Sequence, residues 1–254
     1  MCLITFLPPH TAADDAALAA GARANPHGHG YAIVSGDRLL LERGLDAAQM
    51  IDRFLRARRA HPDGPAVFHS RLATHGRIST ANCHPFAVGG DARTVLAHNG
   101  ILPAAVWPPR RSRRSDTRIA AEQYLPTLGS LRQARVRRRV ERWMGPGNKM
   151  VILTVDPTYR QTAYLLNEQA GFWSEGIWYS NLDFDGAHNR WRDWTIERVG
   201  ECVCGAVLLA QDLFCLHCAR CVLCAAGPDT CQCWETDSDT AHHPQRNGFL
   251  IEPS

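Results

Sequence analysis

Residues 68–76 read Phe68-His69-Ser70-Arg71-Leu72-Ala73-Thr74-His75-Gly76. This segment begins as a short apolar run and ends in polar residues and a glycine. The pattern is typical of a strand that delivers side chains to a site at its end. Arg71 has no obvious helical partner for a salt bridge, so we interpret it as a functional residue.

Two later segments extend the pattern. Asn82-Cys83-His84-Pro85-Phe86 comes first, and a strand-like run over 94–97 then ends in His98-Asn99-Gly100. An Asn-Gly pair after a strand normally forms a tight turn. It can also direct a side-chain amide and a backbone N–H toward one point, as an oxyanion hole requires. Ser115-Asp116-Thr117 opens a helical stretch, in which Ser115 or Asp116 is a candidate N-cap.

The beginning of the chain carries a candidate nucleophile. Cys2 stands directly behind Met1. If an aminopeptidase removes Met1, one residue carries both a thiol and a free α-amino group. The pKa of such an amine lies at about 7.7–8.0, so it can serve as the general base for its own thiol. A Met-Cys start also occurs by chance, and the segments above are what favour the catalytic interpretation.

In order, these segments resemble the class II glutamine amidotransferase domain of the N-terminal-nucleophile hydrolases. That family has an N-terminal Cys, an Arg-x-Ala-Thr-x-Gly segment, an Asn-x-x-Pro-Phe-like segment, a His-Asn-Gly and a Ser-Asp-Thr. The resemblance runs from Cys2 to about Asn181, loosely in its last third. The Gly-rich stretch at 25–31 is similar to the compact stand-alone branch. Leu72 departs from the family, because several members carry an aromatic residue there.

The resemblance implies a role for each matching position. Cys2 would attack the glutamine amide, and its α-amino group would be the base. Arg71 would bind the substrate α-carboxylate through its planar fork, and Asp116 would receive the α-ammonium. The Asn99 side chain and the Gly100 N–H would hold the oxyanion. Thr74, His75 and Gly76 would belong to a loop that closes over glutamine.

Some of these residues, and several of their neighbours, also have simpler interpretations. Asp116 could be only a helix cap, and Asn99-Gly100 only a turn. The mechanism does not need His75, His84 or His98, which we expect to be structural. Cys83 lies in an apolar neighbourhood and is expected to pack as a small hydrophobe.

Composition limits the class of protein. The 254 residues suit one domain of about 200 residues with a small appendage. No apolar run approaches the roughly 20 residues of a membrane span, and no signal peptide is recognisable. We therefore expect a cytoplasmic protein, in which disulfides are disfavoured.

Eight of the ten cysteines fall between 202 and 233. Eight thiolates would complete two tetrahedral sets, the closed form of a structural zinc site. The simplest assignment places two zinc ions, one on Cys202, Cys204, Cys215 and Cys218, the other on Cys221, Cys224, Cys231 and Cys233. An interleaved arrangement stays open, as does His217 in place of a cysteine. An iron–sulfur cluster is the rival, but the three-residue gap and proline of the bacterial ferredoxin run are missing.

The apolar patterns predict alternating paired strands and helices. Strands are expected at 2–7, 30–35, 38–43, 66–73, 94–98, 149–156, 162–167 and 172–180, and helices at 12–23, 46–60, 116–125 and 130–143. This order agrees with the α+β fold that the resemblance implies, a four-layer αββα sandwich. The expected domains are the catalytic domain at 1–200, a zinc-ribbon-like module at 201–234 and a flexible tail at 235–254.

The charge pattern bears on partners. The net charge is only +3, so no global polyanion-binding signal exists. Arginines cluster at 110–114 and at 132–142, in a chain whose only lysine is Lys149. The second cluster is either a solvated helix surface or a docking face for nucleic acid or an acidic partner.

Together these features predict an enzyme that releases ammonia from glutamine for a separate synthetase, because no phosphate-binding loop is seen in which ammonia could be consumed. A stand-alone hydrolase of γ-glutamyl amides is the alternative within catalysis. A zinc-dependent protein that binds nucleic acid or a partner on the same fold is the alternative outside it.

Overall fold

The computed structural model describes residues 2–109, 112–186, 198–203 and 207–209, together with residues 220, 225 and 226. The chain divides into two units, Met1–Asp193 and Trp194–Ser254. In the second unit, β11 (Arg198–Glu201) pairs with β12 (Val207–Leu209) in antiparallel fashion. Of the eight cysteines predicted to bind zinc, only Cys202 is described. The other seven and the predicted tail lie outside the described residues, and the zinc assignment stays a prediction.

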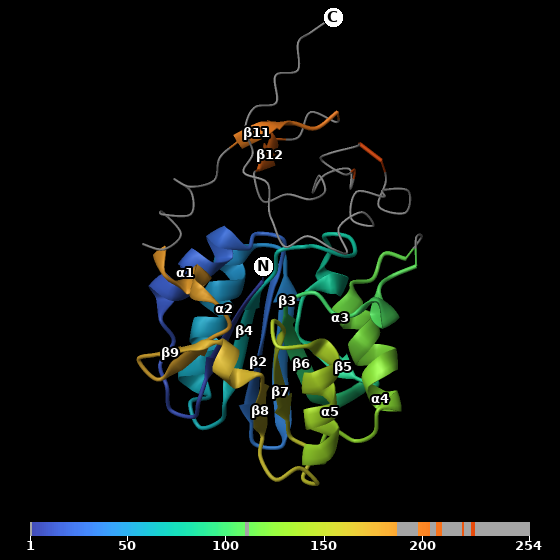
Figure 1. The fold of residues 1–254 in the computed structure, drawn as a ribbon. Helices are drawn as coiled ribbons and strands as arrows, with labels where there is room; N and C mark the ends of the chain where they lie inside the picture. Colours follow the sequence, from blue (N-terminus) through green and yellow to red (C-terminus); the bar gives the residue numbers. More distant parts are fainter. Residues whose placement is uncertain are drawn as a thin grey trace, which may run out of the picture. The chain divides into compact units, whose positions relative to one another are not determined.

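Two antiparallel sheets form the centre of the first unit (Figure 1). The six-stranded sheet has the order β3-β2-β4-β1-β10-β9, and the four-stranded sheet has the order β5-β6-β7-β8. The first sheet comprises β1 (Leu3–Leu7), β2 (His29–Ser35), β3 (Arg38–Gly44), β4 (Ala66–Ser70), β9 (Phe172–Ser174) and β10 (Ile177–Tyr179). The second comprises β5 (Phe86–Val88), β6 (Asp91–Asn99), β7 (Lys149–Thr154) and β8 (Ala163–Leu166).

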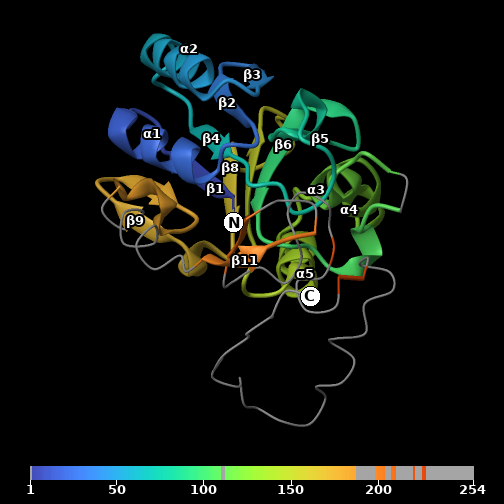
Figure 2. The ribbon, with the colours of Figure 1, turned by 90° about the horizontal axis from the view of Figure 1, so that it is seen from above.

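Helices pack on the outer faces of both sheets (Figure 2). On the six-stranded sheet lie α1 (Asp15–Ala24) and α2 (Ala47–Ala60). Each begins at an aspartate N-cap, because the carboxylates of Asp14 and Asp46 accept backbone N–H groups at 2.9 Å. The four-stranded sheet carries α3 (Asp116–Ile119), α4 (Leu125–Thr127) and α5 (Ala134–Met144).

Three apolar clusters follow from this arrangement. One joins α1 and α2 to the six-stranded sheet, with Leu18 and Phe54 fully buried. Another joins α3, α4 and α5 to the four-stranded sheet. The third lies between the sheets and includes Ile4 and Val67 from one, and Val95 from the other. In most strands, alternate residues therefore belong to different clusters, as the period of two in a strand requires. The fold is a mixed one of helices and antiparallel sheets.

Several predicted elements differ in detail. The single strand expected at 172–180 is a hairpin, because the chain turns at Glu175 and Gly176, both with positive φ. The strand expected at 66–73 ends at Ser70, and the residues after it form an irregular loop. The helix expected at 116–125 is interrupted by a π-helical stretch at 120–124, just before Pro126, which has no N–H to donate. The helix expected at 130–143 begins only at Ala134.

Within the part of the chain that the structure describes, no helix has the length and apolar character needed to cross a membrane.

Candidate active site

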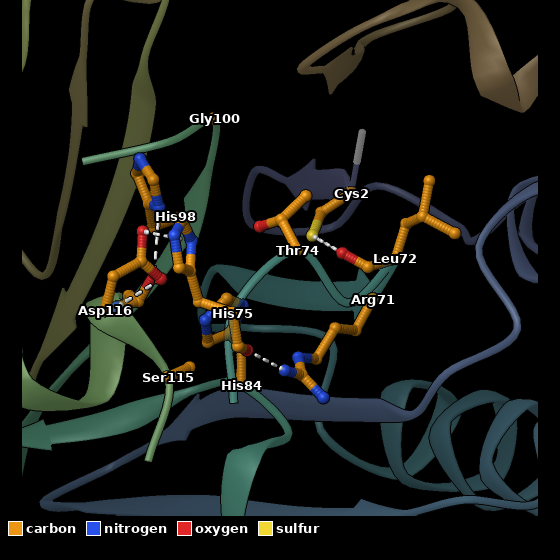
Figure 3. Close-up of a pocket in the computed structure, with 11 residues that line it drawn as sticks. Cys2, Arg71, Leu72, Thr74, His75, His84, His98, Gly100, Ser115 and Asp116 are labelled. Carbon is orange, nitrogen blue, oxygen red and sulfur yellow. Dashed lines mark hydrogen bonds and ion pairs between the residues drawn. The ribbon is translucent and has the colours of Figure 1, made fainter. Parts of the chain in front are cut away.

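One pocket of the first unit collects residues from four distant segments (Figure 3). Cys2 precedes β1, Arg71 follows β4, Gly100 follows β6 and Asp116 opens α3. The antiparallel register pairs Leu3 with Ser70, and this brings the residues just before β1 and just after β4 together. The pocket is lined by Cys2, Arg71, Leu72, Thr74, His75, His84, His98, Gly100, Ser115, Asp116 and Thr117.

Two of the predicted site residues do not line this pocket. Asn99 is fully buried and lies one residue before Gly100, at the end of β6. Gly76 packs against the segment at 114–115, where a Cβ would come within 2.7 Å of the backbone of Ser115. Its φ of +74° also favours glycine. Gly76 therefore shapes the loop, and Thr74 and His75 are the loop residues that reach the pocket.

Cys2 is held by two contacts, one at its thiol and one at its carbonyl. Its Sγ lies 3.4 Å from the carbonyl of Leu72, and its own carbonyl accepts a hydrogen bond of 3.0 Å from Asn181 Nδ2. Burial raises the pKa of the Cys2 thiol, and the nearby positive charge of Arg71 offsets only part of this rise. The thiol is therefore neutral at neutral pH, and it needs a base before it can attack a carbonyl carbon.

Arg71 is buried and its guanidinium is turned toward the following loop (Figure 3). It donates to the carbonyl of His75 at 2.7 Å and to that of Arg77 at 3.2 Å. A guanidinium has five N–H donors, so donors remain for a carboxylate in the pocket. The same side chain can thus bind an anion and hold the loop that covers it.

Asn82 joins this loop to the segment before α3. Its Nδ2 donates to the carbonyls of Arg77 at 2.8 Å and Arg113 at 2.7 Å, and its Oδ1 accepts from the Ser115 N–H at 3.1 Å. Asn82 belongs to the Asn82-Cys83-His84-Pro85-Phe86 segment, in which the sequence pattern predicts no role for it. Its burial and three satisfied contacts now assign it a structural one.

Asp116 faces the pocket, and Ser115 caps the helix. Ser115 Oγ accepts the Arg118 N–H at 3.2 Å, which is the N-cap contact. The Asp116 carboxylate accepts from the N–H groups of Leu102 at 3.1 Å and Thr117 at 2.7 Å. His75 Nδ1 lies 3.9 Å from Asp116 Oδ2. A nearly buried carboxylate with room for another donor can receive an ammonium group.

Asn99 ends β6, and Gly100 follows it without forming a hairpin turn. Gly100 has a φ of +137°, and a Cβ there would collide with Asn148 Oδ1. Both the backbone conformation and the lack of space therefore require glycine. Asn99 Nδ2 lies 2.9 Å from Ser180 Oγ. Asn99 Oδ1 is buried and has no hydrogen-bond partner among the described residues.

The buried histidines near the pocket are uncharged. Burial lowers the pKa of His69 to about 3, and it lowers the pKa of His84 well below the usual range. The carbonyl of His98 can only accept, so His69 Nε2, 3.1 Å away, carries a proton. His98 itself bridges Thr117 Oγ1 at 3.0 Å and Asn148 Oδ1 at 2.9 Å. A base with a pKa of about 3 is too weak to deprotonate a thiol at neutral pH.

Cys83 is fully buried, and its Sγ lies 3.5 Å from the carbonyls of Gly44 and Ser79. A Cβ at Gly28 would collide with this sulfur. Cys83 therefore packs as a small side chain. In the described ranges, no group of three or more His, Cys, Asp or Glu residues is arranged to hold a metal ion.

Comparison with solved structures gives distant matches. Glutamine phosphoribosylpyrophosphate amidotransferase from B. subtilis, complexed with ADP and GMP, is 17% identical over 70% of this chain and 41% of that one, with a TM-score of 0.37. An allosteric regulatory enzyme of purine biosynthesis is 16% identical over 61% and 36%, with a TM-score of 0.39. A glutamine aminotransferase class-II domain protein from Silicibacter pomeroyi is 18% identical over 61% and 73%, with a TM-score of 0.30. The chain thus spans less than half the length of the first two.

A search of curated proteins found no significant match. Residues 15–117 match the family model of the class II glutamine amidotransferases. This segment includes Arg71, Thr74, Asn99, Gly100 and Asp116, and it begins after Cys2. The match of this segment supports a glutamine-hydrolysing enzyme.

Proposed function

We propose that this chain is a glutamine-hydrolysing amidotransferase subunit with Cys2 as its nucleophile. The observation that carries the proposal is the convergence of Cys2, Arg71, Gly100 and Asp116 on one pocket. Arg71 and Asp116 offer opposite charges, as the α-carboxylate and α-ammonium of an amino acid require. The two sheets with helices on their outer faces support the four-layer αββα arrangement of N-terminal-nucleophile hydrolases.

The base in this proposal is the α-amino group of Cys2 after removal of Met1. The raised pKa of the thiol calls for a base, and the low pKa values of His69 and His84 exclude them at neutral pH. An α-amine titrates at about 7.7–8.0, which is close to the pH at which it would act. One residue would then supply both the nucleophile and its base.

The reaction proceeds in two halves. The amine takes the thiol proton while sulfur attacks the amide carbon, and the developing oxyanion is held by the Asn99 side-chain amide and the Gly100 N–H. The amine returns the proton to the leaving nitrogen, so ammonia departs and a γ-glutamyl thioester remains. Water then attacks the thioester carbon with the amine again as base, which releases glutamate and restores the thiol.

The loop that follows Arg71 favours a small substrate. Arg71 and Asn82 both hold its carbonyls, and Gly76 packs it against the backbone of Ser115. A pocket covered in this way suits glutamine better than a bulky γ-glutamyl conjugate. We therefore place glutamine hydrolysis ahead of the hydrolysis of such conjugates.

The ammonia is proposed to reach a separate synthetase in the cytoplasm. The candidate docking elements are the cysteine-rich segment at 202–233 and the arginine-bearing face of α5, which consists of Arg135, Arg138, Arg139 and Arg142. The eight cysteines between 202 and 233 are a donor set suited to two structural zinc ions, which would supply the folding energy of so small a module. The arginine face suits an acidic surface of that synthetase, and contact with nucleic acid is the alternative.

Untagged protein incubated with glutamine tests the proposal. We expect glutamate and ammonia in equal amounts, and no product from the Cys2→Ala variant. Cys83→Ala is the matched control, because Cys83 is buried but does not line the pocket. Asparagine, one methylene shorter, should be a poor substrate. Equal activity of the Cys2→Ala variant, or a preference for γ-glutamyl conjugates, would refute the proposal.

A further inference from the structure

Ser180 lies between the nucleophile strand and the proposed oxyanion donor. It directly follows β10 and is fully buried. Its Oγ accepts the Ile4 N–H at 2.9 Å, and its own N–H donates to the Ile4 carbonyl at 3.0 Å. The same Oγ lies 2.9 Å from the Asn99 amide. One hydroxyl therefore contacts both β1, which begins beside Cys2, and the end of β6.

The hydrogen-bond pattern at this hydroxyl is incomplete in one orientation of the amide. With Asn99 Nδ2 toward Ser180, the Ser180 oxygen accepts two N–H groups, and its own proton is given no acceptor by the described residues. Asn99 Oδ1 is then a buried acceptor without a donor. Such an oxygen beside a developing oxyanion would repel it.

The opposite orientation of the Asn99 amide gives both the hydroxyl proton and Oδ1 a partner, and it leaves Nδ2 as the unpartnered group. The nitrogen and oxygen of an asparagine amide have nearly the same shape, so their hydrogen-bond partners decide which way the group faces. With Oδ1 toward Ser180, the hydroxyl proton has an acceptor and the oxygen has a donor. Nδ2 then occupies the unpartnered position, one residue before Gly100, which lines the pocket, so its N–H groups stay free for a substrate oxygen.

We propose that Ser180 is a positioning residue whose hydroxyl donates to Asn99 Oδ1 and thereby turns Asn99 Nδ2 toward the substrate carbonyl. This inference rests on the proposed function of the pocket. The neighbouring Asn181 helps to fix the position of Cys2, because its Nδ2 donates to the Cys2 carbonyl at 3.0 Å. Two consecutive residues would thus fix the nucleophile and the oxyanion donor relative to each other.

The Ser180→Ala variant tests the inference through a split between kcat and KM. Loss of a single oxyanion donor lowers kcat by about 10²–10³-fold, and we expect the loss for Ser180→Ala to approach the lower value. KM should stay unchanged, because Arg71 and Asp116 still bind the amino-acid end. Ser174→Ala, at the end of the neighbouring strand β9, is the matched control and should keep wild-type kcat.

Two further measurements separate positioning from a general structural role. Alkylation of Cys2 by iodoacetamide builds no oxyanion, so its rate, mapped to the Cys2 peptide by mass spectrometry, should be unchanged in Ser180→Ala. In an Asn99→Ala background, Ser180→Ala should cause no further loss of kcat, because its effect passes through Asn99. If the alanine variant fails to fold, Ser180→Cys takes its place, since a thiol is a weak donor of similar size.

The possible failures are distinguishable. A wild-type chain that releases no glutamate from glutamine would overturn the proposed function and the role of Ser180 with it. An active chain whose Ser180→Ala variant keeps wild-type kcat would overturn the role of Ser180 alone. So would a parallel loss of alkylation, which would place the effect on Cys2, or a full additional loss in the Asn99→Ala background.

Discussion

Arg71 and the arginine-bearing face of α5 place the same residue type in opposite settings. Arg71 is 3% exposed, and two of its N–H groups have fixed carbonyl acceptors. On α5, the exposed arginines form no ion pair with any carboxylate in the described part of the chain. They are Arg135, Arg138, Arg139 and Arg142.

The difference shows how an arginine should be interpreted in a chain whose basic side chains are nearly all arginines. A buried guanidinium is expensive to place, so it persists only where fixed acceptors offset the loss of its water. An exposed one keeps its water and can be replaced at little cost. The pocket should therefore be sensitive to conservative changes, and the α5 face should tolerate even charge reversal until a partner is present.

Among arginine substitutions in the two regions, Arg71→Lys is expected to have the largest effect on glutamine hydrolysis. Lysine keeps the charge but loses the planar fork, so the carboxylate contact and the two loop contacts cannot all be kept. Hydrogen bonds to charged groups contribute about 1.5–3 kcal/mol, and we expect kcat/KM for glutamine to fall by about 10²-fold, mainly through KM. Arg138→Lys on α5 is the matched control and should leave kcat/KM unchanged. Normal glutamine affinity in Arg71→Lys would show that the carboxylate binds elsewhere.

Acid should destabilise the fold through its buried neutral histidines. The pKa values of His69, about 3, and His29, about 4, lie below the ordinary 6.5, so the unfolded chain binds protons more readily than the folded one. Their contribution to the free energy of unfolding is fully present above about pH 6.5. It is lost as the pH falls toward 4 for His29 and toward 3 for His69. Each such group contributes a slope of about 1.4 kcal/mol per pH unit.

Chemical denaturation between pH 7 and 4.5 measures this slope. His69→Gln should reduce the pH dependence of the free energy of unfolding by about one such slope. His10→Gln, at an exposed position, is the control and should leave the dependence unchanged. Equal slopes for wild type and His69→Gln would mean that His69 is not buried as a neutral ring.

Charge reversal on α5 should have a small effect on the isolated chain. Arg135→Glu, Arg138→Glu and Arg142→Glu together should change the free energy of unfolding by less than about 1 kcal/mol and leave glutamine hydrolysis intact. The same variant should weaken capture of an ammonia-accepting synthetase from the native host. Unchanged capture of that synthetase would identify the face as only a solvated helix surface.

The smallest effect on glutamine hydrolysis is expected from removing metal. Elemental analysis of protein made without added metal should find about two equivalents of zinc. Chelation should unfold the cysteine-rich segment and leave hydrolysis by the first unit nearly unchanged. Iron with sulfide in place of zinc would support a cluster, and loss of all hydrolysis on chelation would tie the segment to the pocket.

The sequence predicted most of the strands and helices because their apolar patterns are regular. The paired strands expected at 30–35 and 38–43, the helix expected at 46–60 and the strand expected at 94–98 are confirmed. The hairpin at 172–179 was missed, because Ser174-Glu175-Gly176 was taken as part of one strand and the two strands on either side are only three residues long. The three-residue strand β5 was missed because it is too short for a periodic pattern.

The sequence could predict which residues belong to the candidate site, but it could not predict the hydrogen bonds that join them. Motif order indicated Arg71, Gly100 and Asp116, and the structure brings them to one pocket with Cys2. Asn82 and Ser180 could not be assigned from the sequence, because their partners are backbone and amide groups at distant positions. Such contacts depend on how the loops and the two sheets meet, and local sequence patterns do not encode this.

The most direct test of the account is the intact mass of the chain after reaction with a glutamine-mimicking diazoketone. We predict a chain that lacks Met1 and carries a single adduct, which peptide mapping places on Cys2 and which excess glutamine prevents. An active chain that keeps Met1, or an adduct on Cys83 or another cysteine while Cys2 stays unmodified, would contradict the account.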